Sequence, residues 1–96
     1  MKKGGKKVDN IGYTTKNLKE LYKLEGYTRT SLSEEIGINY KTLYDKLEGN
    51  TKFKLDEAKK IADLFNISID FLFYYKEDDF LYQYVQKTGT KKEEVI

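Results

Sequence analysis

The stretch Thr28–Asn50, TRTSLSEEIGINYKTLYDKLEGN, decides how this chain folds. Its pattern predicts two short helices, Arg29–Ile36 and Tyr40–Glu48, with a tight turn at Gly37 between them. Glycine suits such a turn because it adopts a positive φ without steric cost. We therefore expect two helices that follow one another closely and pack as one unit.

Both predicted helices have a start signal and an apolar side. Thr28 and Asn39 stand at the two starts, and these residue types favour the N-cap because their side-chain oxygens accept from free backbone N–H groups. The apolar side comprises Leu32, Ile36, Ile38, Leu43 and Leu47. With these residues buried, the opposite side of the second helix is free to lie in the major groove of DNA.

Helical spacing continues on both sides of this unit. The further expected helices are Lys16–Glu25, Asp56–Phe65 and residues 68 to about 75. Thr14 or Thr15 is the expected N-cap of the first of them, and Gly26 follows its end. Residues 71–75 are also aromatic enough for a strand, and the stripe from Phe80 to Val85 indicates a candidate short C-terminal helix.

The composition excludes several classes of protein. A chain of 96 residues forms a single domain. It contains no Cys and no His, which rules out disulfides, a zinc site of the usual Cys/His kind and any mechanism that needs histidine. No apolar run approaches the roughly 20 residues of a membrane span. We therefore expect no cofactor, no metal, no membrane association and no enzymatic activity.

The positive charge is concentrated at the N-terminus. The net charge is only +2, and residues 14–75 carry ten basic and ten acidic side chains. Residues 1–13 hold four lysines against Asp9, between several glycines. This segment is predicted to be a flexible basic arm. It either follows DNA phosphates or is a solvated tail.

The stretch Thr28–Asn50 and the following FKLDEAKKIADLFNISIDFLF resemble the phage repressor and Cro-like family, also called the XRE family, over about residues 16–75. The resemblance implies an all-α fold, a five-helix lambda-repressor-like DNA-binding domain over residues 14–75. A C-terminal extension, residues 76–96, follows. Three residues depart from the family pattern: Ser33 replaces the usual Ala, Arg29 replaces a common Gln, and Lys46 occupies an often apolar position, where we expect Leu47 to be buried.

The family's mode of binding implies residue roles. The residues implied to contact bases are Asn39, Tyr40, Lys41, Tyr44 and Asp45. The residues implied to contact phosphates are Thr28, Arg29, Asn50, Lys52 and Lys54. Each set has a simpler interpretation: the tyrosines shield the edge of the core, Asn39 serves only as a cap, Lys41 and Asp45 form a surface pair, and the loop lysines serve solubility.

The C-terminal segment is rich in aromatic residues, which exceed what one small core is expected to absorb. They are Phe71, Phe73, Tyr74, Tyr75, Phe80, Tyr82 and Tyr84. They either pack back on the first helix or form an exposed patch of the kind that marks a partner site. Because operators of this family are read by dimers, we expect residues 71–85 to make a homodimer contact.

The sequence thus predicts a cytoplasmic, nucleoid-associated transcriptional regulator, a repressor or Cro-like protein. It would read a palindromic operator in double-stranded DNA through the helix at residues 39–48. One alternative is an antitoxin, whose aromatic tail binds a toxin protein. Another is a protein-interaction module that retains the fold without binding DNA, which the low net charge and Asp45 favour.

Overall fold

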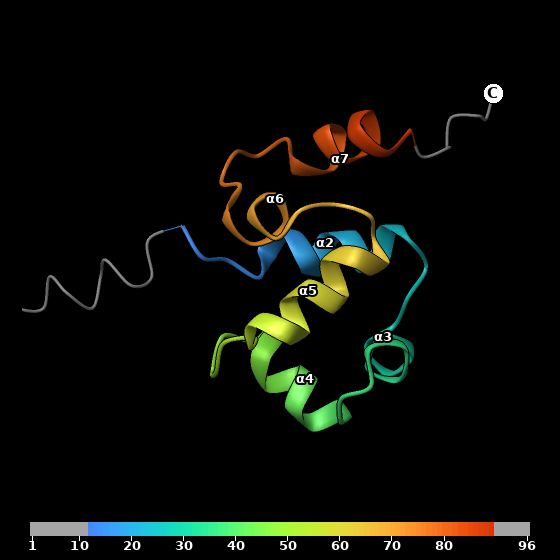
Figure 1. Ribbon diagram of the computed structural model, residues 1–96, viewed down its shortest axis with the longest axis vertical. Helices are drawn as coiled ribbons and strands as arrows, with labels where there is room; N and C mark the ends of the chain where they lie inside the picture. The colour runs from blue at the N-terminus through green and yellow to red at the C-terminus, as the bar shows by residue number, and fades with distance from the viewer. Residues whose placement is uncertain (1–11, 90–96) are drawn as a thin grey trace, which may run out of the picture.

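The computed structural model describes residues 12–89, which form six α-helices and no strand (Figure 1). The helices are α2 (Lys16–Leu24), α3 (Arg29–Ile36), α4 (Tyr40–Leu47), α5 (Leu55–Leu64), α6 (Ile69–Tyr74) and α7 (Phe80–Thr88). The all-α prediction is confirmed, and the candidate C-terminal helix is α7. The helix expected from residue 68 to about 75 is α6, and the alternative of a strand at residues 71–75 is wrong. Most of the predicted arm, residues 1–11, lies outside the described residues.

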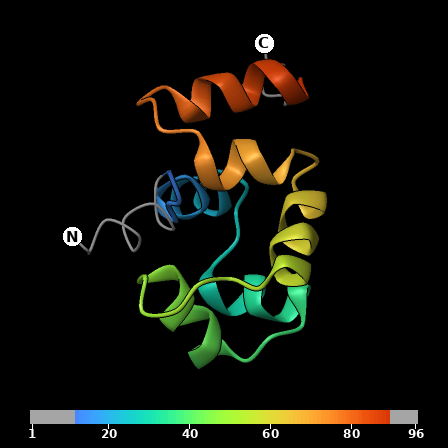
Figure 2. The same ribbon diagram turned by 60° about the vertical axis from the view of Figure 1, so that its left-hand side comes forward.

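The helices are arranged in three levels, which Figure 2 shows most clearly. Helix α2 packs against α6 and α7, so it lies in the middle of the molecule. Helix α5 packs against both α6 and α3, and α3 packs against α4. Helices α4 and α7 therefore lie at opposite ends of the molecule. None of the helices in residues 12–89 has the length and apolar character needed to cross a membrane.

One hydrophobic core joins all six helices. Leu18 and Leu21 of α2, Leu32 of α3 and Ile61 of α5 are fully buried within it. Burial of one such side chain stabilises the fold by about 1.5–3 kcal/mol. Leu43 and Leu47, on the inner side of α4, belong to the same core. The burial expected for Leu47 is confirmed.

The tail aromatics mostly enter this core. Phe71, Phe73, Phe80 and Tyr84 are buried, and the amide of Asn17 joins α2 to α6 by donating to two backbone carbonyl oxygens. For these four, the alternative of packing back on the first helix holds, whereas Tyr74 and Tyr82 stay exposed. The reason is α7, which packs on α2 and adds a layer that covers the rings of α6.

The predicted caps are mostly found. The Thr28 side chain accepts from the Ser31 N–H at 3.0 Å, and Gly37 has a φ of +75°. Thr15 is the N-cap residue of α2, but its hydroxyl donates to the Leu47 carbonyl at 2.9 Å. That bond connects the start of α2 to the end of α4. Thr14 supplies the cap oxygen instead, accepting from the Lys16 N–H at 3.0 Å.

Candidate nucleic-acid interface

Helix α4 presents one side to solvent and buries the other. Leu43 and Leu47 are completely buried, whereas Tyr40 is 48% exposed and Tyr44 is 43% exposed. Lys41 is exposed as well. Leu43 and Leu47 are four residues apart, and so are Tyr40 and Tyr44, so each pair lies along one face of a helix with a 3.6-residue period. A row of polar and aromatic groups is therefore available along the outer face of α4.

Asn39 is engaged as the N-cap of α4. Its side-chain oxygen accepts from the Lys41 N–H at 2.8 Å and from the Thr42 N–H at 3.2 Å. A bidentate pairing with adenine needs this oxygen, so the cap leaves only the amide nitrogen for a base. The cap also orients the first turn of α4, where Tyr40 and Lys41 lie.

Asp45 points toward the loop that follows α4. Its carboxylate accepts from Asn50 Nδ2 at 3.5 Å, and its backbone carbonyl accepts from the Asn50 N–H at 2.9 Å. Among the ion pairs of residues 12–89, none joins Lys41 to Asp45. Within the described part of the chain, Lys41 therefore has no carboxylate partner that a DNA base would have to displace.

Arg29 is held by three neighbours at the start of α3. It donates to Glu48 at 2.6 Å and to the Tyr22 hydroxyl at 3.2 Å, and its guanidinium lies over the Tyr44 ring at 4.8 Å. The hydrogen bonds to Tyr22 and Glu48 raise the pKa of Arg29. The hydrogen bond that Arg29 donates to Glu48, together with the nearby charge of Lys19, lowers the pKa of Glu48. The predicted phosphate ligand thus also links α3 to α4.

Thr28 is likewise occupied. Its hydroxyl and backbone N–H both bond with Ser31, which forms a capping box at the start of α3. Capping boxes of this kind satisfy two of the free N–H groups at a helix start. The Thr28 side chain therefore shapes this helix end, and only the remaining backbone N–H groups would be available to a phosphate.

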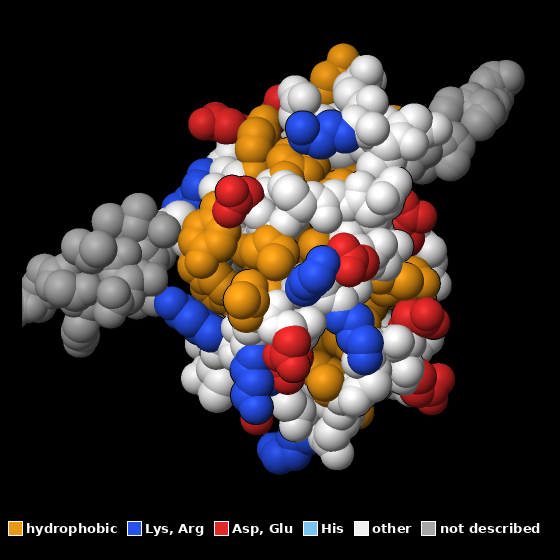
Figure 3. Space-filling view, in the orientation of Figure 1, with side chains coloured by type: hydrophobic (Ala, Val, Ile, Leu, Met, Phe, Trp, Pro, Cys, Tyr) orange, Lys and Arg blue, Asp and Glu red, His pale blue; other side chains and the backbone are white. Residues whose placement is uncertain are grey.

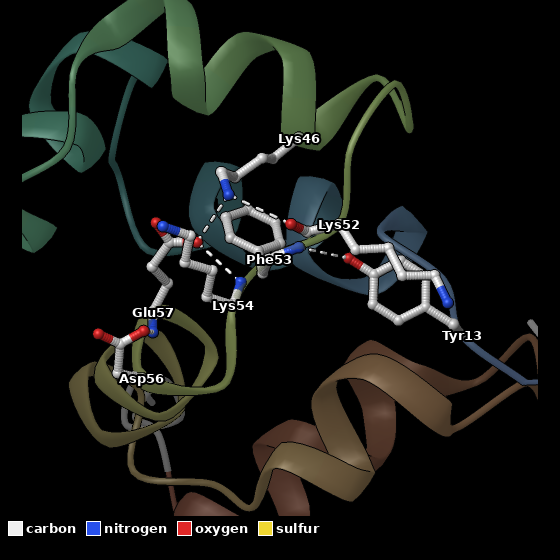
Figure 4. Close-up of polar contacts among 7 residues, drawn as sticks. All are labelled: Tyr13, Lys46, Lys52, Phe53, Lys54, Asp56 and Glu57. Carbon is white, nitrogen blue, oxygen red and sulfur yellow. Dashed lines mark hydrogen bonds and ion pairs between the residues drawn. The ribbon is translucent and has the colours of Figure 1, made fainter. Parts of the chain in front are cut away.

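The loop after α4 carries the remaining predicted phosphate ligands. Asn50, Lys52 and Lys54 are all exposed. Lys52 lies over the Tyr13 ring at 5.0 Å (Figure 4). The Tyr13 hydroxyl accepts from the Phe53 N–H at 3.3 Å.

Lys46 is the unexpected residue of this region. It is 5% exposed, and its ammonium lies 2.8 Å from the Glu57 carboxylate (Figure 4). The same ammonium donates to the Lys52 carbonyl at 3.2 Å. Because lysine is rarely buried without a charged partner, a lysine on the apolar side of a helix predicts such a partner. The sequence alone does not identify Glu57 as that partner.

Basic and acidic side chains are mixed on this surface. In Figure 3, Lys and Arg side chains gather in the lower left part, over α4 and the following loop, with acidic side chains between them. The face is therefore not a uniform basic field. Such a surface would attract DNA only modestly without regard to sequence, so any binding there would depend on how individual side chains are placed.

Two short helices joined at a positive-φ glycine, with the second presenting an exposed face, define a helix-turn-helix DNA-binding domain. The sequence model of the Cro/C1-type helix-turn-helix DNA-binding domain matches residues 17–78. The chain belongs to this family. The resemblance to the repressor and Cro-like proteins is confirmed.

The fold is also similar to a solved structure. The crystal structure of a transcriptional regulator from Listeria innocua superposes with a TM-score of 0.59 at 26% sequence identity. The match covers 83% of this chain and 78% of that one. A search among curated proteins found no match.

Proposed function

We propose that this protein is a sequence-specific transcriptional regulator, repressor or Cro-like in action, that reads a palindromic operator in double-stranded DNA through α4. The outer face of α4 carries this proposal. Tyr40, Lys41 and Tyr44 are exposed while Leu43 and Leu47 anchor the helix from behind. The structural similarity to a transcriptional regulator supports it.

Each residue predicted to contact bases has a distinct role in this proposal. Lys41 donates to guanine O6 and N7, and Asp45 accepts from cytosine N4. Tyr40 and Tyr44 contact thymine methyl groups or phosphates. Asn39 contributes through its amide nitrogen, since its oxygen caps the helix.

Phosphate contacts flank these base contacts. The start of α3, at Thr28 and Arg29, grips one side through its backbone N–H groups and the guanidinium. Asn50, Lys52 and Lys54 grip the other side from the loop that follows α4. These contacts set the position of α4 on the duplex, and the base contacts supply the specificity.

The protein acts as a homodimer in this proposal, on the nucleoid in the cytoplasm. Tyr82 on α7 is 63% exposed, and Leu81 and Val85 on the same helix are only partly buried. This outer face of α7 is the surface by which a second copy would pair. Half-sites about 34 Å apart would follow from such symmetry. Sedimentation that shows a monomer at high concentration, with and without DNA, would contradict the dimer.

Selection of binding sites from random-sequence DNA tests the proposal as a whole. We expect the selection to recover a short palindrome. The purified wild-type protein should still bind this palindrome at physiological salt. Recovery of an asymmetric site would contradict the proposal that the protein binds DNA as a homodimer. No enrichment of any sequence, under conditions in which the protein is folded, would contradict sequence-specific binding.

A further inference from the structure

The backbone between α4 and α5 is fixed at Lys52 and Lys54 by two side chains from the flanking helices (Figure 4). Lys46 of α4 donates from Nζ to the Lys52 carbonyl at 3.2 Å. Glu57 of α5 accepts from the Lys54 N–H at 2.8 Å. The ion pair between Lys46 and Glu57 closes this arrangement, since one carboxylate oxygen, Oε1, receives both the ammonium and the Lys54 N–H.

The Lys46–Glu57 pair is buried. It contacts the backbone of Lys52 and Lys54, whose side chains are exposed. The side chains of Lys46 and Glu57 are 6% and 16% exposed. Removing two charges from water is costly, and apolar side chains of similar size usually stabilise a fold equally well or better. Stability alone is therefore a weak reason for a lysine at position 46, inside the apolar side of α4. The geometry of the loop between α4 and α5 gives a better reason for this lysine.

We propose that Lys46 and Glu57 are positioning residues of the DNA interface. By fixing the backbone at Lys52 and Lys54, they aim these two exposed side chains at DNA phosphates without contacting DNA themselves. This inference rests on the proposed DNA-binding function, and it adds two buried residues to the surface side chains that the function requires.

The double variant Lys46→Met/Glu57→Met separates this role from a structural one. It removes both charges together, so no buried charge is left unpaired and the net charge is unchanged. We expect a folded protein with a melting temperature equal to or above that of the wild type. The loop backbone, however, loses the contacts at the Lys52 carbonyl and the Lys54 N–H, so these two lysines are aimed less well, although the Phe53 N–H between them keeps its bond to Tyr13.

The readout is the dependence of DNA affinity on salt, measured with labelled short duplexes of random sequence. Each phosphate contact contributes about 0.9 to the slope of log K against log salt concentration. We expect the slope of the double variant to fall by up to about 1.8, the value for two lost contacts. Lys52→Ala/Lys54→Ala should lower it equally, and combining all four substitutions should lower it no further.

The matched control is Lys59→Met/Asp63→Met, which removes an exposed ion pair from α5 and also preserves net charge. It should leave the slope unchanged. A folded Lys46→Met/Glu57→Met variant with the wild-type slope would overturn the inference. A wild-type protein that does not bind these duplexes at low salt would instead contradict the DNA-binding function itself.

A more conservative variant covers the case in which the double variant does not fold. Lys46→Met/Glu57→Gln also removes both charges, and the glutamine keeps an amide oxygen that can accept from the Lys54 N–H. It frees only the Lys52 carbonyl, so the slope should fall by about 0.9. Lys59→Met/Asp63→Met is again its control. A slope for Lys46→Met/Glu57→Gln equal to that of this control would overturn the inference.

Discussion

Arg29 Nη2 lies 2.6 Å from Glu48 Oε2, so the first residue of α3 is joined to the residue that caps the end of α4. The two helices of the motif are therefore connected by charge as well as by the turn at Gly37. The contact helps to fix the orientation of α4 relative to α3. It also withdraws guanidinium donors from any phosphate that approaches the start of α3.

Replacing Glu48 should release Arg29 for DNA. In Glu48→Ala, we expect the slope of log K against log salt concentration to steepen by up to about 0.9, because the Arg29 charge that Glu48 offsets in the wild type then acts fully on the phosphate. Glu35→Ala, which removes an exposed carboxylate from α3, controls for the change in net charge. Equal slopes in the two variants would show that Arg29 does not exchange its partner for a phosphate.

Lys41 should contribute to specificity rather than to general affinity. We expect Lys41→Ala to relax selection at one base pair of each half-site, at a cost of about 1–3 kcal/mol for the preferred base. Selection from random DNA with the variant measures this effect. Lys59→Ala, on an exposed part of α5, should select the wild-type sequence. If Lys41→Ala selects the same sequence as the wild type, then Lys41 does not contact a base.

The cap at Asn39 should be measurable as stability. Asn39→Ala should lower the free energy of unfolding by about 1 kcal/mol, since two N–H groups of α4 lose their acceptor. Asn39→Ser retains a capping oxygen and should recover most of that loss. Denaturant unfolding of both variants checks the prediction, and equal losses in the two would argue against the cap.

The Lys46–Glu57 pair should make stability depend on acid pH. Burial raises the pKa of Glu57, but hydrogen bonds from Lys46 and from the Lys54 N–H outweigh it, so the pKa lies below its ordinary value of 4.5. A carboxyl with a lowered pKa in the folded state contributes stability that is fully present above its unfolded pKa. That contribution is lost as the pH falls through the folded pKa.

Lys46→Met/Glu57→Met should therefore lose less stability than the wild type as the pH falls below about 4.5. Thermal unfolding across this pH range measures the difference. Glu34→Gln, which removes an exposed carboxylate, should behave as the wild type does. Parallel curves for the wild type and the double variant would mean that Glu57 is not held in its charged form.

The helices were predictable because local signals agree with one another. Thr28, Gly37 and Asn39 punctuate the chain in the way that caps and turns require, and Leu43 and Leu47 keep the helical period. The bounds of several helices differ from the prediction by about one residue, as helix ends do. The family resemblance rests on these same residues.

The partners of charged side chains were not predictable. Glu48 lies 19 residues from Arg29, and Glu57 lies 11 residues from Lys46, so tertiary packing alone brings each pair together. The choice between the two alternatives for the tail aromatics could not be made for a related reason. Whether Phe80 is buried depends on how α7 folds back on α2, which no local pattern states.

In the proposed complex, the outer face of α4 lies against DNA bases. Titration of a selected duplex into isotope-labelled protein, followed by amide NMR, tests this placement. We expect the amides of Tyr40, Lys41 and Tyr44 to shift most and those of α7 to shift little, apart from any dimer contact. Shifts confined to α7, with α4 unchanged at saturating DNA, would contradict it.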